Sequence, residues 1–512
     1  GIRNKAVEIL GKKNPNEVAI AFAELLGDPN TNLEVREFAL NTMKGVKEEN
    51  LVIALLNTYN TGKSQYYSLL NTMLAALGEF DYPEVKKAVI EIAHSDDYPV
   101  DIRKKAIDTF EEKGFPTKKE EDWKYTSLNA IINKDYSIAS KGDKKIKYEK
   151  VREYFLHDID SYKVVFIDGV FSSFLSETSH DGLDVCLLSS VLSKEKYKAI
   201  IEAYYNKIAS KDSITSLNTA FAKEGAYINI PNNKEVDKPI EIINFSTGNE
   251  TALMMQPRNL IIVGENAHVQ IIERHQSLSN NAVFTNSVTE IFVEKRAYLD
   301  FYKIQNDKEN ASLIDNTFIH QEQDTNCNVH TFSLGGKITR NNLNFSQNGE
   351  HSDSTLKGVT ILKDKQHVDH NTLVNHISPN CESHQDYKGL YADSSTGVFN
   401  GRVIVEKQAQ KINAFQQNNN ILIDDNATVN AKPQLEIFAD DVKCSHGCTI
   451  GQFDEDALFY LRSRGIGLKE AQALLMYAFA NTVLETVKIP ELKRRINNLI
   501  AEKIGVNIGF DI

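Results

Sequence analysis

Cysteine is scarce in this chain. Its 512 residues include five cysteines, an odd number without regular spacing. They are Cys186, Cys327, Cys381, Cys444 and Cys448. Secreted proteins stabilised by disulfides carry a denser and usually even set, so the count excludes a disulfide framework and indicates a reducing compartment. We therefore expect a cytoplasmic protein.

Excess positive charge and long apolar runs are also absent. Lys and Arg number 58 against 70 Asp and Glu, which gives a net charge of -12. A negative chain repels phosphate backbones and anionic lipid surfaces, so we expect neither nucleic acid nor a membrane as a partner. The best apolar run, residues 473–480, is far shorter than the roughly 20 residues that a membrane-spanning helix needs.

No motif for nucleotide hydrolysis or sugar cleavage is complete. Residues 57–64 end in Gly-Lys-Ser but lack the first glycine of a phosphate-binding loop, so we interpret them as a turn between helices. A β-helical carbohydrate-active enzyme would need cooperating carboxylates, and the pairs Asp424-Asp425 and Asp440-Asp441 would face opposite sides of a strand. The sequence therefore predicts that the protein is not an enzyme.

The chain divides into four segments by pattern. Residues 1–113 repeat a helical phrase, as in Val35-Arg36-Glu37-Phe38-Ala39-Leu40, which is typical of HEAT-like α-helical repeats. Residues 114–225 mix helical and strand patterns, residues 226–452 consist of short strand patterns, and residues 453–512 are helical again. We predict a mainly β protein with α-helical regions at both ends.

Several strand patterns begin with the same phrase, a polar pair followed by alanine. The alanines are Ala267, Ala297 and Ala427, and each precedes alternating apolar and polar residues. A small residue fits a crowded corner where successive coils of a solenoid stack. This pattern favours a parallel β-solenoid over an antiparallel two-sheet sandwich.

The last predicted helix carries an apolar stripe. Its members are Leu492, Ile496, Leu499 and Ile500. A solenoid needs its terminal coil covered, and an apolar helix face can also dock a partner protein. Both interpretations stay open, and the second makes these four residues a partner interface.

The densest group of metal-ligand residue types is Cys444-Ser445-His446-Gly447-Cys448. In a strand, Cys444, His446 and Cys448 share one face, within reach of a common soft metal, unless Gly447 breaks the alternation. The alternative is two cysteines packed in the core and a buried histidine with satisfied hydrogen bonds. Three ligands do not close a tetrahedral site, so a partner chain would complete it.

Residues 367–384 are rich in histidine but predict no metal site. His367 and His370 are three positions apart and would face opposite sides of a strand. We interpret the histidines His367, His370, His376 and His384, with Cys381 and Asp369, as polar turn and solvent-facing residues.

Four phrases together resemble the SufB/SufD family of iron–sulfur cluster assembly subunits. They are Gly114 to Thr126, which contains the chain's single tryptophan, then residues 225–231, 409–418 and 439–447. The last phrase continues to Gly465, so the resemblance extends over about residues 101–512 in the expected order. The Ser445-His446-Gly447 sequence is similar to the SufD branch of the family.

The resemblance implies a right-handed parallel β-helix that acts as a non-catalytic scaffold. Its implied partners are a SufB-like paralogous subunit and a SufC-like ABC-type ATPase. It further implies a transient iron–sulfur cluster shared with the partner subunit, bound here through Cys444 and His446, and no permanent cofactor. The HEAT-like segment and Cys448, where relatives carry a small residue, depart from the family pattern. A HEAT and β-solenoid adaptor without a cluster role remains the alternative.

Overall fold

The computed structural model describes most of the chain from residue 115 onward. The described residues are 115–134, 136–138, 146–156, 158–177, 182–192, 194–210, 212–222, 224–248 and 252–505. The HEAT-like repeats predicted for residues 1–113 and the turn at residues 57–64 lie outside them. Two compact units form, residues 1–116 with 211–221, and residues 117–210 with 222–512.

The described helix of the first unit is α11 (Ser213–Phe221). The Asp212 carboxylate accepts hydrogen bonds from the backbone N–H groups of Ile214 and Thr215, each at 2.9 Å. This is the usual way in which an aspartate satisfies the free donors at a helix start.

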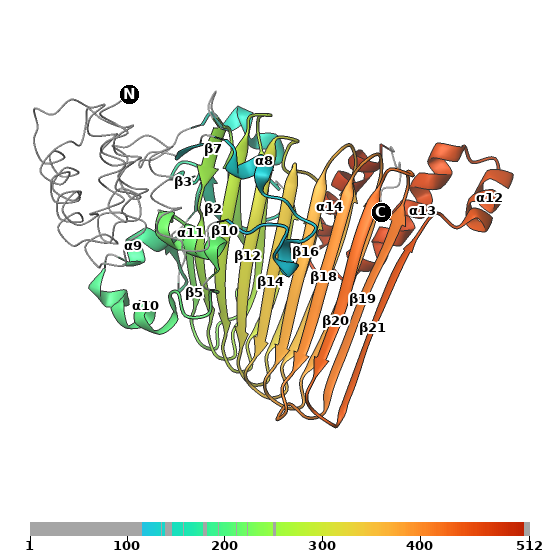
Figure 1. The fold of residues 1–512 in the computed structure, drawn as a ribbon. Coiled ribbons are helices and arrows are strands. Elements are labelled where there is room, and N and C mark those ends of the chain that lie inside the picture. Colours follow the sequence, from blue (N-terminus) through green and yellow to red (C-terminus); the bar gives the residue numbers. More distant parts are fainter. Residues whose placement is uncertain are drawn as a thin grey trace, which may run out of the picture. The chain divides into compact units, whose positions relative to one another are not determined.

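The second unit is a parallel β-solenoid of about 8 turns (Figure 1). From β8 onward, successive strands alternate between two sheets, and residues paired in neighbouring coils are about 30 positions apart, as Gln270 and Asp300 are. The parallel solenoid predicted from the sequence is confirmed, and the antiparallel sandwich is excluded. Only the short pairs β2–β3 and β4–β5, where the solenoid begins, are antiparallel among the described strands.

Sheet A has eleven strands and sheet B has ten. Sheet A contains β1 (Tyr136–Ile138), β4 (Asp184–Leu187), β5 (Ala226–Ile230), β7 (Ala252–Met255), β8 (Arg258–Val263), β10 (Val283–Val293), β12 (Ala311–Gln321), β14 (Ile338–Gln347), β16 (His367–His376), β18 (Thr396–Val405) and β20 (Thr428–Ile437). Sheet B contains β2 (Tyr162–Ile167), β3 (Val170–Phe171), β6 (Ile240–Ser246), β9 (His268–Ser277), β11 (Tyr298–Gln305), β13 (Asn326–Ser333), β15 (Asp353–Leu362), β17 (Glu382–Tyr391), β19 (Ile412–Leu422) and β21 (Val442–Gly451).

The alanines of the repeated phrase do occupy the corners of the coils. Ala267 and Ala297 are each 1% exposed, and the residues before them, Asn266 and Arg296, have φ of 56° and 57°. A left-handed residue turns the chain sharply, and the small side chain after it leaves room for the coil above. The corner therefore depends on residue size as well as on hydrophobicity.

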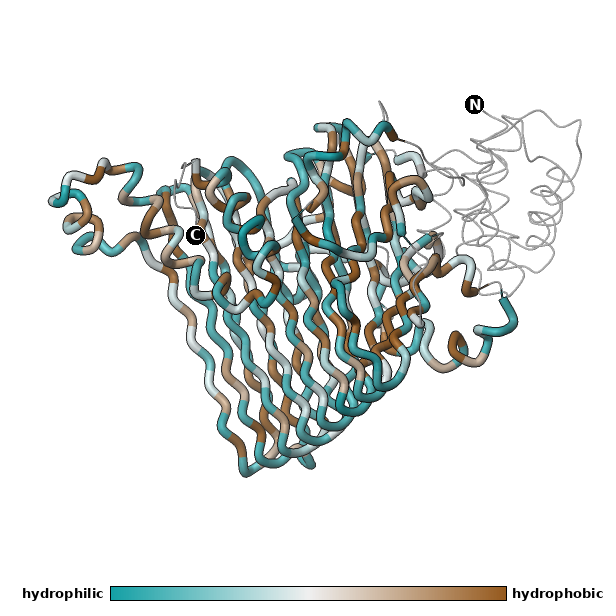
Figure 2. The backbone as a smooth tube through the Cα atoms, turned by 180° about the vertical axis from the view of Figure 1, so that it is seen from behind, coloured by the Kyte–Doolittle hydropathy of each residue, from teal (hydrophilic) through white to brown (hydrophobic). Residues whose placement is uncertain are grey.

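The interior of the first coils is apolar. In the first coils it is packed with branched apolar side chains from both sheets, such as Ile228, Ile242, Ile261 and Ile271, all fully buried. In Figure 2, the hydrophobic residues are concentrated in these first coils of the solenoid. Apolar burial is the main stabilising contribution there.

A segment that we name the N-terminal strap, residues 117–132, crosses the outer face of sheet A. It contains η1 (Glu121–Trp123) and α8 (Asn129–Ile132). The Arg340 guanidinium lies 3.9 Å from the ring centre of Trp123 and donates a 2.8 Å hydrogen bond to the carbonyl of Asp122. The lone tryptophan thus attaches the strap to β14.

Short elements form the rest of the entry region. They are η2 (Tyr148–Lys150), η3 (Arg152–Tyr154), α9 (Leu188–Leu192), η4 (Glu195–Tyr197) and α10 (Lys198–Tyr204). Tyr197 packs edge to face against Tyr227 of β5, with ring centres 5.6 Å apart, so these helices cover the start of sheet A.

Three helices follow the solenoid: α12 (Glu455–Ser463), α13 (Leu468–Leu484) and α14 (Pro490–Ile504). Leu492, Ile496 and Ile500 are fully buried in one core with outward-facing sheet B side chains such as Phe332 and Leu390. The predicted stripe therefore covers the side of sheet B and not the end of the last coil. Its buried members are not exposed to a partner, because intramolecular packing already uses them. No described helix is long and apolar enough to cross a membrane.

Candidate metal centre

The candidate site lies on the final strand of the solenoid. Strand β21 pairs with β19 on one side, and β20 is the corresponding outermost strand of sheet A. Among the described strands, no other strand pairs with the outer edge of either. The last coil therefore ends in two unpaired sheet edges, whose backbone groups can pair with another chain.

Strand geometry places the three ligand-type residues on the inward face of β21. Ala414, Gln416 and Asn418 of β19 alternate with exposed neighbours and are buried inside the coil. Their register partners on β21 are Cys444, His446 and Cys448, in that order. Gly447 does not interrupt the strand, which runs unbroken from Val442 to Gly451.

Sharing a face does not bring the three ligand atoms together. Same-face residues along a strand are about 6.6 Å apart, twice the rise per residue. Among the described residues, the one group of three ligand atoms that lie within 4.8 Å of one another is found elsewhere. The chain therefore presents an open row of ligands, which a partner would have to complete.

The exposure of His446 bears on the alternative that it is a buried imidazole. His446 and Cys448 are exposed, while Cys444 is half-buried against an apolar cluster that includes Cys381 and Ala414. The alternative of a buried, satisfied imidazole is thus wrong for this residue. Burial raises the pKa of the Cys444 thiol and of the Cys448 thiol, so both favour the protonated form at neutral pH.

Behind this row lies an amide that sequence reasoning did not single out. Gln416 is 1% exposed, and neither its Oε1 nor its Nε2 has a hydrogen-bond partner in the described structure. On the opposite sheet, a Cβ placed on Gly401 would come within 2.4 Å of Gln416 Nε2. A buried amide without partners costs stability, so Gln416 is available to hydrogen bond to a group at the site. The sequence pattern that could have identified Gln416 is the segment 409–418, in which the alternation of a strand places Gln416 on the inward face.

The histidines of residues 367–384 lie in strands β16 and β17, as does Asp369, and Cys381 lies in the turn between these strands. The interpretation as turn residues is therefore wrong for the histidines and Asp369, and the solvent-facing interpretation holds only for the half-exposed His384, since Cys381 is fully buried. His367 and His370 do face opposite sides of β16. The first contacts Thr126 of the strap at 2.9 Å, and the second contacts Thr360 inside the coil at 2.8 Å. Asp369 is a buried ion-pair partner of Arg340, and His376 contacts Ser383 at 3.0 Å. Each of these contacts satisfies a polar group within the protein.

The acidic pairs also lie in turns and not within strands. Asp424 accepts a hydrogen bond from the backbone N–H of Asp393, and Asp393 accepts one from that of Asp364. These carboxylates support successive corners of the solenoid.

The group of close ligand atoms is Glu273, His275 and Asp315, buried inside the middle coils. Lys303 Nζ lies 3.1 Å from Glu273 and 2.7 Å from Asp315. Although burial opposes ionisation, Lys303 and His275 lower the pKa of Glu273 to about 2. The Lys303 ammonium thus occupies the position between the two carboxylates and forms an ion pair with each.

Comparison with known proteins agrees with the fold. A family model described as SUF system FeS cluster assembly, SufBD core domain, matches residues 245–479, and the SufBD protein N-terminal region matches residues 80–242. The second match begins inside the segment predicted as HEAT-like, residues 1–113.

Several relatives are similar over most of their length. An iron–sulfur cluster assembly SufBD family protein of Synechocystis is 30% identical over 81% of this chain and 94% of its own. The iron–sulfur cluster assembly protein SufD of Escherichia coli is 30% identical over 76% of this chain and 90% of its own. The chloroplastic protein ABCI7 of Arabidopsis thaliana is 29% identical over 78% of this chain and 84% of its own. The chain therefore belongs to the SufBD family of iron–sulfur cluster assembly proteins.

Proposed function

We propose that this chain is a non-catalytic scaffold subunit of a cytoplasmic SufBCD-type complex. It pairs with a SufB-like subunit through the last coil and with a SufC-like ATPase through its C-terminal helices. A transient iron–sulfur cluster is shared with the SufB-like subunit, and Cys444 and His446 are its ligands from this chain. The observation that carries the proposal is the row of inward ligands between two unpaired edges at the end of the solenoid.

The unpaired edges explain the need for a partner. Strands β20 and β21 are ten residues long, and apolar side chains remain exposed near them at Ile437, Phe438 and Ile450. A long edge with exposed apolar residues is a site for pairing with another chain. A paralogous solenoid stacked on this end would satisfy both edges and cover the ligands.

The ligand chemistry fits a cluster in transit. Imidazole and thiolate both bind iron, and a row of ligands that cannot close around one ion leaves positions for partner thiolates and sulfide. The thiols must lose their protons on binding, so the raised pKa of Cys444 favours release of the cluster.

The C-terminal helices suggest a different docking surface from the predicted stripe. With Leu492, Ile496 and Ile500 buried, and Leu499 packed against the same core, α14 anchors the helical region to sheet B. Helix α12 exposes Phe459 and Tyr460, at 74% and 57%. We infer that the ATPase docks on α12.

Coexpression with SufB-like and SufC-like chains tests this function. The wild-type complex should copurify and gain iron and sulfide on reconstitution. The variant His446→Ala should still assemble but lose most of the cluster, with a smaller loss for Cys444→Ala and the smallest for Cys448→Ala. Ser445→Ala, on the outward face of the same strand, is the matched control. Full iron and sulfide content in the His446→Ala complex would exclude the site, and failure to copurify would favour the adaptor alternative.

A further inference from the structure

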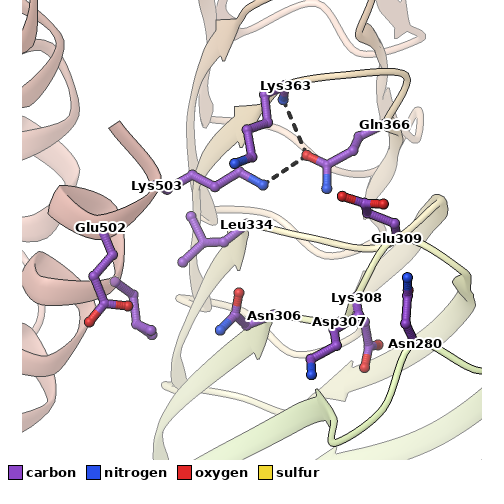
Figure 3. A pocket seen from close by; sticks show the side chains of 11 residues that line it. Asn280, Asn306, Asp307, Lys308, Glu309, Leu334, Lys363, Gln366, Glu502 and Lys503 are labelled. Carbon is purple, nitrogen blue, oxygen red and sulfur yellow. Dashed lines mark hydrogen bonds between the residues drawn. The ribbon is translucent and has the colours of Figure 1, made fainter. Parts of the chain in front are cut away.

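A cavity of about 460 Å³ lies between α14 and the turns that follow successive strands of sheet B (Figure 3). Lys503 enters it from the last turn of α14, and Lys308 and Lys363 enter it from the turns after β11 and β15. Its volume lies in the range of small-molecule sites. Neither the cluster site nor the proposed docking surfaces include these residues.

The ammonium groups of Lys503 and Lys308 donate to neutral acceptors. Lys503 Nζ donates a 2.8 Å hydrogen bond to Gln366 Oε1, and Lys308 Nζ donates one of 3.4 Å to the carbonyl of Leu278. Within the part of the chain that the structure describes, none of the three ammonium groups forms an ion pair with a carboxylate. Figure 3 shows Gln366 bonded to both the ammonium group of Lys503 and the backbone N–H of Lys363.

Gln366 orients this pair. It is 6% exposed, and its Oε1 also accepts a 3.2 Å hydrogen bond from the backbone N–H of Lys363. Because the amide is held by the turn, the Lys503 ammonium is held beside the turn that carries Lys363. The like charges of Lys363 and Lys503 repel each other, and a bound anion would lower that cost.

The electrostatics agree with this geometry. Burial, and then the charge of Lys363, lower the pKa of Lys503 to about 8, while Asp364 and Glu309 raise it only in part. The C-terminal end of a helix favours cations, so the position of Lys503 in the last turn of α14 does not explain its lowered pKa. A bound anion would restore the full positive charge of Lys503.

We propose that this cavity binds a small, multiply charged oxyanion, a carboxylate or a phosphate, between the ammonium groups of Lys363 and Lys503. The lining also carries the carboxyl groups of Asp307, Glu309 and Glu502. Burial raises the pKa of Asp307, and Glu309 and Glu502 disfavour a large polyanion, so the ligand must be compact enough for the lysine side of the cavity.

Calorimetric titration of the full chain at about pH 8, near the pKa of Lys503, tests the site. The probes are inorganic phosphate and citrate, each in two buffers of different ionisation enthalpy. We expect saturable binding of at least one probe with proton uptake, weakened about tenfold or more by Lys503→Met and by Lys363→Met. The control is Lys493→Met on the same helix, whose ammonium pairs with Glu485 at 2.8 Å. Binding of only one probe identifies the anion class.

A second measurement uses the unaltered protein. Acylation of Lys503, followed by mass spectrometry at about pH 8, should be slowed by the probe that binds, while acylation of Lys493 should not change. Absence of saturable binding by both probes, or equal affinity in wild type and Lys503→Met, overturns the proposal. If both lysine variants fail to fold, unchanged acylation of Lys503 in the presence of phosphate and citrate overturns it.

Discussion

Gln416 and His446 are register partners on the last two strands of sheet B, with the amide buried and the imidazole exposed. Both polar atoms of the amide lack a partner, and its inner neighbour in the same column is Gln385. A ligand histidine in a metal site is usually oriented by a hydrogen bond from a second group. We propose Gln416 as that positioning residue for His446 in the proposed cluster site.

Replacing Gln416 by methionine should separate stability from function. The variant Gln416→Met removes two unsatisfied polar atoms at nearly constant volume, so the melting temperature should stay equal or rise. The imidazole would lose its orienting partner, so cluster yield in the complex should fall by about tenfold. Iron and sulfide analysis measures the yield, and nitrogen NMR shifts of His446 report its tautomer. Unchanged yield and tautomer would remove Gln416 from the site.

The strap should depend on a buried charge network. Arg340 pairs with Asp369 at 2.5 Å, both being 2% exposed, and Thr126 also donates to that carboxylate. Removing the carboxylate in Asp369→Ala leaves the guanidinium without its counter-ion, at a cost of about 3–5 kcal/mol. Trp123 is the chain's single tryptophan, so its emission reports the strap directly, and we expect a red shift. The control is His384→Ala, a half-exposed residue of β17, which should leave the emission unchanged. An unshifted emission spectrum in Asp369→Ala would contradict the charge network.

The free energy of unfolding should decrease as the pH decreases, because several histidines are buried in their neutral form. Burial lowers the pKa of His330 and of His376 to about 3 and that of His370 to about 4, against an ordinary value of 6.5. Below pH 6.5 the unfolded chain takes up protons that the folded chain does not, so each histidine removes up to about 1.4 kcal/mol of stability per pH unit until its folded pKa is reached. Denaturant titrations of wild type and His376→Gln should converge as the pH falls from 6.5 toward 4. Parallel curves would show that His376 is not buried in its neutral form.

Alkylation of the thiols should require alkaline pH. Burial raises the pKa of Cys444 and Cys448 from the ordinary value of 9.0 and raises that of the fully buried Cys327 well above it. Because the thiolate is the reactive form, alkylation rates should still be rising above pH 9.0. Cys448 should react fastest, Cys444 more slowly and Cys327 slowest. Mass spectrometry of each modified peptide across pH gives the midpoints. A midpoint below 9.0 at Cys444 would contradict the raised pKa.

Local patterns were enough to predict much of this fold. Alternating residues and small corner residues such as Ala267 indicate a parallel solenoid, and the period of a strand places Cys444, His446 and Cys448 on one face. These properties depend on a few consecutive residues, so they can be inferred without knowing which distant segments meet. The same local argument could not decide whether His446 is buried, because the pattern alone does not show that β21 is the last strand.

The sequence by itself determined the coil, the shared face of Cys444, His446 and Cys448, and the absence of a complete catalytic motif. Tertiary structure alone decided what distant residues do to one another. It paired Gln416 with His446, placed Arg340 against Trp123, bonded Lys503 to Gln366 and buried the stripe of Leu492 against sheet B. The physical reason is that an apolar stripe or a buried charge contributes energy only through its partner, and the register between coils and the docking of helices select that partner.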